Sequence, residues 1–290
     1  INTKVEFFFK KLLPSIFSSG VTQINILIGT IIASFEAGAV SYLYYADRIY
    51  QINLAIAGIA IGTVMLPELS KNIKSRNFKN AMNIQNKALE LCLLFSLPAC
   101  FGLIIASEEI ISSLFGYGSF SEENVISTAQ ALKYFGYGVP AFALIKVLSN
   151  FLFARDNTKV PFYISAFIVF LNILISLTYF KEVGFVIIPI ATSISTWAGV
   201  LTYSILLIKF KYFSFESTFS FNLLKVVISL VIMTLALYYS INFFEDKLIY
   251  SNYYKSIYLI TIIILTAGIY LLLARLLGVF RLKNFIKNKK

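Results

Sequence analysis

The chain of 290 residues has no histidine, two cysteines and one tryptophan, and only 13% of its residues are charged. Without imidazole it lacks the commonest side chain for metal binding and for proton transfer near neutral pH. Two cysteines do not make a disulfide framework. Soluble domains carry about a quarter charged residues, so a cytosolic globular protein is disfavoured. These shortages argue against most hydrolases and zinc proteins, and we expect no metal site, no catalytic residue and no cofactor.

Long apolar runs fill the sequence instead, and 58% of the residues are hydrophobic. A bilayer core is crossed by about 20 mostly apolar residues in a helix. Eight such runs are present, at 12–33, 40–66, 88–106, 127–153, 160–180, 183–208, 222–244 and 256–280. Backbone groups inside a bilayer must pair within each segment. The sequence therefore predicts an all-α polytopic membrane protein with eight transmembrane helices.

The net charge of +11 is compatible with nucleic acid, an anionic substrate or the inner face of a membrane protein, and the positions of the charges decide. Most Lys and Arg residues lie in the N-terminal stretch, in every second connection and in the C-terminal tail. The third-to-fourth connection holds four glutamates and no cation. By the positive-inside rule both ends are predicted to be cytoplasmic. Membrane lipids are then expected partners, and nucleic acid is not.

The basic segment 67–87 lies between the second and third predicted spans. It places five cations among apolar residues. An amphipathic helix on the inner leaflet and a solvated loop are both compatible with it.

The first span carries polar side chains along one face. At 100° per residue its Ser, Thr and amide residues fall within an arc of about 160°. Packing of small polar residues against another helix would explain most of them. Gln23 and Asn25 favour a watered cavity, because their amides are larger than a tight helix crossing prefers and need partners.

The second span contains Arg48 in an apolar helix, about 12 Å from the outer end. Insertion of an Arg near the bilayer centre costs about 2.5–3.5 kcal/mol, and such a cost usually marks a function. A stripe of polar and small residues shares its face: Ser41, Tyr44, Gln51, Ala55, Gly58 and Gly62. Asp47 offers the competing interpretation, a structural ion pair with Arg48.

A guanidinium in a cavity of low dielectric matches phosphate oxygens bidentately and stays charged at any working pH. Arg48, with Asp47 and Gln51 beside it, therefore predicts an anionic, phosphorylated ligand. Lys146 lies in the fourth span near the Gly136–Pro140 interruption. Cavity lining and snorkelling to the interface are equally compatible with Lys146.

Several motifs together resemble those of the lipid II flippase family (MurJ/MviN type), within the multidrug/oligosaccharidyl-lipid/polysaccharide exporter superfamily. They include Gln23-Ile24-Asn25, Tyr45-Ala46-Asp47-Arg48, Leu66-Pro67-Glu68-Leu69-Ser70, Leu114-Phe115-Gly116-Tyr117-Gly118-Ser119-Phe120 and Phe153-Ala154-Arg155-Asp156-Asn157. Beyond about residue 165 the similarity is confined to hydropathy and helix count.

The resemblance implies fourteen helices, in two six-helix lobes plus a C-terminal pair. Residues 1–221 would then form the second lobe, and residues 222–290 the helix pair and a basic cytoplasmic tail. The N-terminal lobe would be absent from this chain. The implied substrate is undecaprenyl-pyrophosphate-linked peptidoglycan precursor, moved across the bacterial inner membrane by alternating access. Arg48 inherits contact with the pyrophosphate, and the final pair a groove for the undecaprenyl tail.

Two positions depart from the family pattern. Many relatives carry an acidic residue at the position of Gly29, and some bind sodium there with help from the fifth span. On the fifth span this chain has Asn172 but Ser176 in place of a carboxylate. Sodium coupling is therefore not expected.

Three competing functions remain open from the residues alone. A drug or polysaccharide exporter of the same superfamily is the nearest. An integral-membrane enzyme acting on lipid carriers lacks obvious machinery, because the outer glutamates have no neighbouring cation or nucleophile. A purely structural subunit would make Arg48 a packing device.

Overall fold

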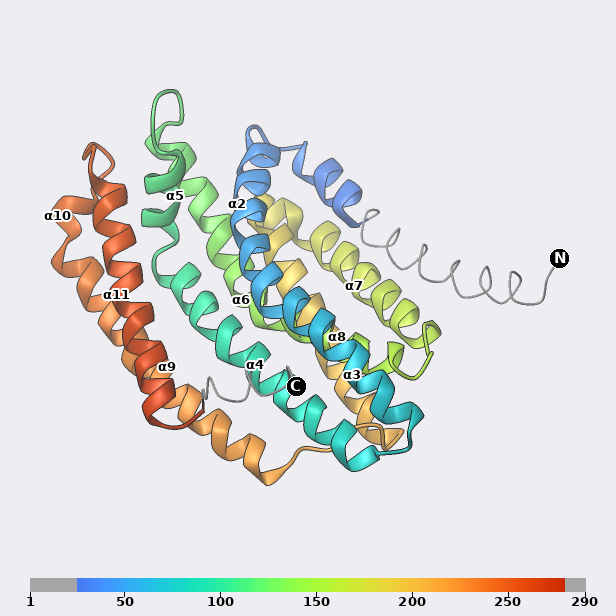
Figure 1. Cartoon of the computed structure of the whole chain (residues 1–290). Helices are drawn as coiled ribbons and strands as arrows, with labels where there is room; N and C mark the ends of the chain where they lie inside the picture. The colour runs from blue at the N-terminus through green and yellow to red at the C-terminus, as the bar shows by residue number, and fades with distance from the viewer. Residues whose placement is uncertain (1–24, 280–290) are drawn as a thin grey trace.

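The computed structural model describes residues 25–279, which are helical apart from short turns and contain no strand (Figure 1). Six segments of this part are long and apolar enough to cross a membrane, so the chain is a multi-pass membrane protein. One of the six, Lys159–Lys209, is 51 residues long and folds back on itself. The predicted span 12–33 lies largely outside the described residues, where only the helix 25–33 is seen. The count of eight spans stays a prediction.

The helices after 25–33 follow one another with short connections. Their bounds are α2 (Ala39–Leu54), a π-helix η1 (Ala55–Ala60), α3 (Ile61–Lys74), α4 (Phe78–Ile105), α5 (Ser107–Phe115), α6 (Glu122–Phe153), α7 (Lys159–Val183), a 3-10 turn η2 (Gly184–Val186), α8 (Ile187–Lys209), α9 (Ser217–Phe243), α10 (Glu245–Leu248) and α11 (Lys255–Leu276). The elements α2, η1 and α3 form one uninterrupted helical run (Figure 1).

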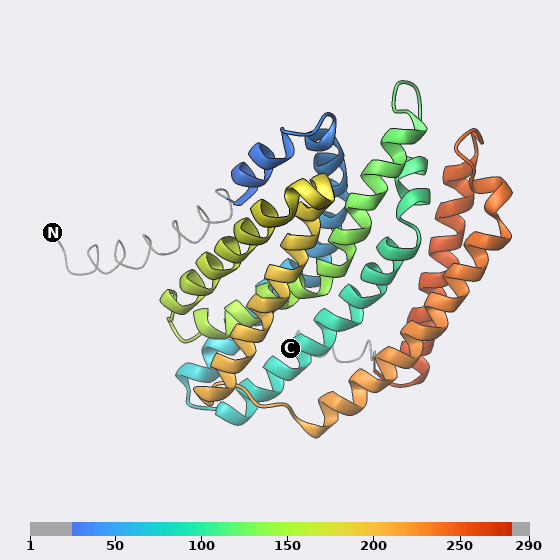
Figure 2. The same ribbon diagram turned by 180° about the vertical axis from the view of Figure 1, so that it is seen from behind.

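Helix α6 is the centre of the bundle. It packs against α2, α4, α5 and α8, and α7 packs on the outside against α8 (Figures 1 and 2). Helices α9 and α11 pair with each other and contact the rest mainly through α4, at the side of the molecule away from α7. Leu94 of α4 meets Leu230 and Tyr270 of the pair in one apolar cluster. The pair is therefore a lateral addition to a bundle centred on α6.

The chain reverses between α7 and α8 at Gly184. This residue has φ 75° and ψ −159°, a conformation open essentially to glycine alone. The next residue, Phe185, donates its backbone N–H to Glu36 Oε2 at 2.7 Å. The tight turn explains how one long apolar segment forms two packed helices.

The basic and acidic connections lie at opposite ends of the bundle. The turns α3–α4, α6–α7 and α8–α9 lie at the lower end in Figure 1, and the α5–α6 loop with its glutamates at the upper end. The expectation of a separate surface helix or loop over 67–87 was wrong: α3 continues through Pro67 to Lys74, and α4 begins at Phe78. The hydropathy pattern missed the last turns of α3 and the first turns of α4, because these ends of apolar helices are polar.

Helix η1 approaches α6 closely at Gly58. A Cβ atom added there would lie 3.0 Å from Ala143 Cα and 3.4 Å from Ala143 O, and both of these are backbone atoms. Backbone cannot move aside as a flexible side chain can. Close passage of η1 over α6 therefore requires the absence of a side chain at position 58.

Gly58→Leu is expected to lower the thermal midpoint of the purified protein by about 5–10 °C, because overpacking of this kind costs about 1–3 kcal/mol. Gly102→Leu is the matched control, since a Cβ at Gly102 meets no atom within 4 Å. Thermal unfolding in detergent measures both. Equal midpoints for the two variants would show that the contact at Gly58 is not tight.

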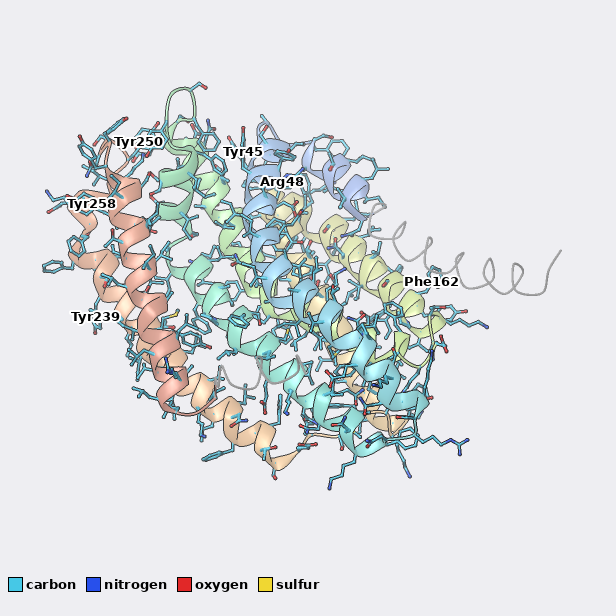
Figure 3. All side chains as sticks on the ribbon, in the orientation of Figure 1. Tyr45, Arg48, Phe162, Tyr239, Tyr250 and Tyr258 are labelled. Atoms are coloured by element: carbon cyan, nitrogen blue, oxygen red, sulfur yellow. The ribbon has the colours of Figure 1, made fainter. Side chains whose placement is uncertain are left out.

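Lys255, whose side chain is fully buried, connects the C-terminal pair to the α5–α6 loop through hydrogen bonds. Its Nζ donates to Gly116 O at 2.9 Å and to Tyr250 O at 2.7 Å. The same atom lies 4.5 Å from the ring centroids of Tyr117 and Tyr250. Ser256 adds a bond to Tyr117 Oη at 2.7 Å. We call these five residues the Lys255 cluster; Figure 3 shows Tyr250 at this upper end.

Glu109 of α5 is half-buried near the same end, and its Oε2 has no hydrogen-bond partner among the residues that the structure describes. Burial raises the pKa of this carboxyl above its ordinary 4.5, and the nearby charges of Glu108 and Glu245 raise it further. The folded state therefore holds this proton more tightly than the unfolded state does.

The stabilising contribution of protonated Glu109 is present in full below the ordinary pKa and is lost as the pH rises through the raised pKa. Glu109→Gln is expected to be more stable than the unaltered protein at pH 7 and to lose this part of the pH dependence. Melting curves between pH 4 and 8 measure the effect, with Glu182→Gln, at an exposed position of α7, as control. A Glu109→Gln protein that is less stable at pH 7 would contradict it.

Candidate functional site

Arg48 lies on the upper half of α2, one turn beyond Tyr45 (Figure 3). Its side chain is exposed, donates from Nη2 to Tyr44 Oη at 3.2 Å, and has its Cζ 4.8 Å from the Tyr44 ring centroid. No carboxylate of residues 25–279 lies within 4.0 Å of it. Within residues 25–279 the guanidinium therefore has no ion-pair contact, and it lies exposed on the surface of a membrane-spanning helix.

Asp47 does not neutralise Arg48. Its Oδ2 accepts a hydrogen bond from Gln51 Nε2, one turn further along α2, and the carboxyl is half-buried. The alternative of a structural Arg48–Asp47 ion pair is wrong for this structure. The i, i+4 spacing explains the observed pair, because Asp47 and Gln51 are about 40° apart around the helix, whereas Asp47 is about 100° and Gln51 about 60° from Arg48.

The stripe predicted to run from Arg48 to Gly62 is divided by the π-helix η1. Arg48 and Ala55 are exposed, whereas Gly58 and Gly62 are buried. A π-turn takes in an extra residue and so rotates the residues after it by about one position, or about 100°. The polar upper half therefore faces outward, while the glycines face α6.

The polar face of the first predicted span is only partly described. Gln23 lies outside the described residues. Asn25 begins the visible helix 25–33 with a half-exposed side chain, and its Oδ1 is buried without a hydrogen-bond partner among the described residues. Within residues 25–279 this oxygen accepts no hydrogen bond, as expected for a residue whose partner is a ligand or another part of the protein.

Lys146 is exposed on α6 but is not close to Arg48. Its carbonyl oxygen lies 3.6 Å from a Cβ built on Gly62, which places it beside α3. Tyr50, two residues after Arg48, stacks on Phe135 of α6 with centroids 5.0 Å apart. Because α2–α3 and α6 run in the same direction, Lys146 is about 16 Å further along the bundle than that level. The structure thus brings Asp47, Arg48 and Gln51 together but leaves Lys146 apart.

Ser176, one of the two departures from the family pattern, forms a hydrogen bond with Asn172 of the same helix. Asn172 Nδ2 donates to Thr192 Oγ1 at 2.8 Å, and Ser176 Oγ donates to Asn172 Oδ1 at 3.3 Å. In the described part of the chain, no three His, Cys, Asp or Glu residues are grouped as metal ligands.

Two further cations contrast with Arg48. Arg155 donates to Phe151 O at 2.6 Å and to Tyr212 O at 2.8 Å, and burial lowers the pKa of its guanidinium. Lys255 is likewise bonded to carbonyls. The sequence did not distinguish these structural cations from Arg48, because each has one acceptor in a distant part of the chain, Tyr212 O for Arg155 and Gly116 O for Lys255. Tyr44 was recognised as sharing the face of Arg48 but not as its partner.

The arrangement is that of a helical multi-pass membrane protein. An outward-facing multidrug resistance MATE transporter of the MOP superfamily has the same fold, with a TM-score of 0.61 at 16% identity over 81% of this chain and 53% of that one. A solved structure titled lipid II flippase MurJ, inward closed conformation, matches with a TM-score of 0.75 and 28% identity over 95% of this chain and 55% of that one.

The family model for the lipid II flippase MurJ matches residues 1–275, and the chain belongs to this family. A probable lipid II flippase MurJ of Rhizobium meliloti is 37% identical over 79% of this chain and 43% of its own length. One of Buchnera aphidicola subsp. Baizongia pistaciae is 29% identical over 98% of this chain and 56% of its own length. The chain thus spans about half the length of the curated relatives it matches.

Proposed function

We propose that this chain is the C-terminal part of a flippase that moves lipid-linked peptidoglycan precursor, lipid II, from the inner to the outer leaflet of the bacterial inner membrane. Residues 1–221 belong to the second lobe, residues 222–290 form the helix pair and basic tail, and an N-terminal lobe completes the transporter. The observation that carries the proposal is the exposed Arg48, which no carboxylate of residues 25–279 contacts, together with family membership.

The chemistry of Arg48 suits the head group of lipid II. A pyrophosphate offers paired oxygens to a guanidinium, which binds them bidentately where water is scarce. Gln51, Asn25 and Gln23 supply amides for the remaining polar groups, and Asp47 holds Gln51 in place. Lys146, about 16 Å along the bundle, serves as a second cationic position on the route. No bond is made or broken in this function.

The lobes rock about the site so that it opens to each side in turn. The basic turns α3–α4, α6–α7 and α8–α9 face the cytoplasm under the positive-inside rule, and so do both ends of the chain. The head group then enters from the basic end, while the lipid tail stays in the bilayer beside α9 and α11.

The experiment is depletion of the full-length protein in growing cells, followed by an assay of lipid II on each leaflet. We expect precursor to accumulate on the inner leaflet and to return to the outer leaflet when the protein is resupplied. An unchanged distribution would contradict the proposal.

The fold shared with multidrug transporters makes a drug exporter the alternative. An uncompensated Arg48 disfavours organic cations, because like charge repels them. Purified full-length protein that binds an organic cation and ignores lipid-linked pyrophosphates would establish the alternative.

A further inference from the structure

A polar cleft of about 750 Å³ lies at the basic end, between the first turns of α4 and the first turns of α9. It is separate from Arg48 and contains none of the residues assigned to transport. Its lining includes two cations, two carboxylates and several amides, among them Lys79, Asn83, Lys87, Glu90, Glu216 and Asn222. A cleft that contains charges of both signs is complementary to a ligand that carries both a negative and a positive group.

Among the described residues the opposite charges of this cleft are not in ion-pair contact, although Lys87 and Glu90 interact electrostatically across one turn of α4. No ion pair within 4.0 Å joins Lys79 or Lys87 to Glu90 or Glu216. Both lysines are exposed, whereas both glutamates are half-buried. A surface at which opposite charges stay apart leaves each of them available to a ligand.

The acidic side of the cleft is held in place by neutral groups. Asn222 Nδ2 donates to Glu90 Oε1 at 3.0 Å. The backbone N–H of Glu216 donates to Asn86 Oδ1 at 3.3 Å, and Asn86 Nδ2 donates to Ser214 O at 3.0 Å. These bonds connect α4 to the start of α9, and they hold the carboxylate of Glu90 and the backbone of Glu216 in place without cancelling a charge.

The depth and surroundings of the cleft match a phospholipid head group. Lys87 and Glu90 are three residues apart on α4, or about 4.5 Å along the helix axis, whereas Lys79 lies about 12 Å nearer the start of the helix. After Glu90, α4 continues into its apolar part. Phe221 and Leu224 of α9 flank Asn222 and are 61% and 56% exposed. A polar head in the cleft would therefore have apolar surface beside it for acyl chains.

We propose that this cleft binds the head group of a zwitterionic phospholipid that carries a phosphate and a primary ammonium. Lys79 and Lys87 bind the phosphate, and Glu90 and Glu216 bind the ammonium. A lipid with negative charge alone fits less well, because the two carboxylates repel it. The site does not depend on the proposed transport of lipid II, and it places a lipid where the C-terminal pair meets α4.

The test measures lipid retained by the purified full-length protein after extraction from vesicles with equal parts of phosphatidylethanolamine, phosphatidylglycerol and phosphatidylcholine. Native mass spectrometry identifies the bound lipid. We expect phosphatidylethanolamine to be retained preferentially, because the quaternary ammonium of phosphatidylcholine has no N–H to donate. The double variant Glu90→Gln/Glu216→Gln is expected to lose about fivefold or more of the preference over phosphatidylglycerol.

Lys79→Gln/Lys87→Gln is expected to reduce retention of all three lipids, because each carries a phosphate, and these exposed substitutions remain informative if the glutamate variant does not fold. Lys71→Gln/Lys74→Gln is the matched control, since these lysines lie at the same end on α3 but outside the cleft. Retention that is equal for the three lipids, a preference for phosphatidylglycerol, or equal effects of the cleft and control variants would overturn the proposal.

Discussion

An Arg48→Ala variant of the full-length protein is expected to fold normally and to lose lipid II translocation by about 100-fold or more. Each hydrogen bond to a charged group is worth about 1.5–3 kcal/mol, and 1.4 kcal/mol corresponds to a tenfold change. Stability is expected to change little, because Arg48 is exposed and contacts only Tyr44 through its guanidinium. Translocation in reconstituted vesicles and a melting curve measure the two quantities.

Arg48→Lys separates charge from geometry. A lysine keeps the positive charge but presents a point donor in place of a planar fork. We expect Arg48→Lys to recover only a small part of the activity. Lys133→Ala is the control, because Lys133 is an exposed cation of α6 that the proposed site does not use. Full translocation activity of the Arg48→Ala variant would contradict the prediction and would indicate that Arg48 has only a structural role.

Lys255→Met is expected to lower the thermal midpoint by about 5–10 °C. The substitution removes two hydrogen bonds and two cation–π contacts at a fully buried position. It leaves Gly116 O and Tyr250 O without this donor, at a cost of about 2–4 kcal/mol. The C-terminal pair then loses one of its polar attachments to the α5–α6 loop, while the hydrogen bonds of Ser256 to Tyr117 and of Tyr250 to Phe120 O remain.

Lys247→Met, at an exposed position of α10, is the control for Lys255→Met. Thermal unfolding of both variants in the same detergent gives the comparison. An unchanged midpoint for Lys255→Met would show that apolar packing alone holds the pair to the bundle.

Hydropathy located the apolar cores of the described helices well. The predicted spans 127–153 and 183–208 correspond to α6 and α8 within a few residues. The start of α4 was missed by ten residues, since Phe78–Lys87 is helical but too polar to register as a span. Polarity and helicity are separate properties at the ends of membrane helices, and a hydropathy pattern reports only the first.

The site was predictable only as far as local chemistry defines it. Arg48 was identifiable because a charge in an apolar helix is costly. The sequence could not decide whether Arg48 is paired with Asp47, because this depends on the side-chain directions of Asp47 and Gln51. The π-helix η1, which contains Gly58 and separates Arg48 from Gly62, was not indicated by the periodicity of the sequence. The structural role of Lys255 was not predictable for the same reason as that of Arg155, because one acceptor of each is far away in the sequence.

The most direct test of the central claim is photo-cross-linking of lipid II from position 44. A photoreactive residue replaces Tyr44, which is 54% exposed beside Arg48, and in a control it replaces Tyr137, which is 47% exposed on α6. In membranes supplied with lipid II, we expect a cross-link from position 44 that excess unlabelled lipid II suppresses, and none from position 137. No cross-link from position 44, or equal cross-linking from both, would contradict a substrate-facing Arg48.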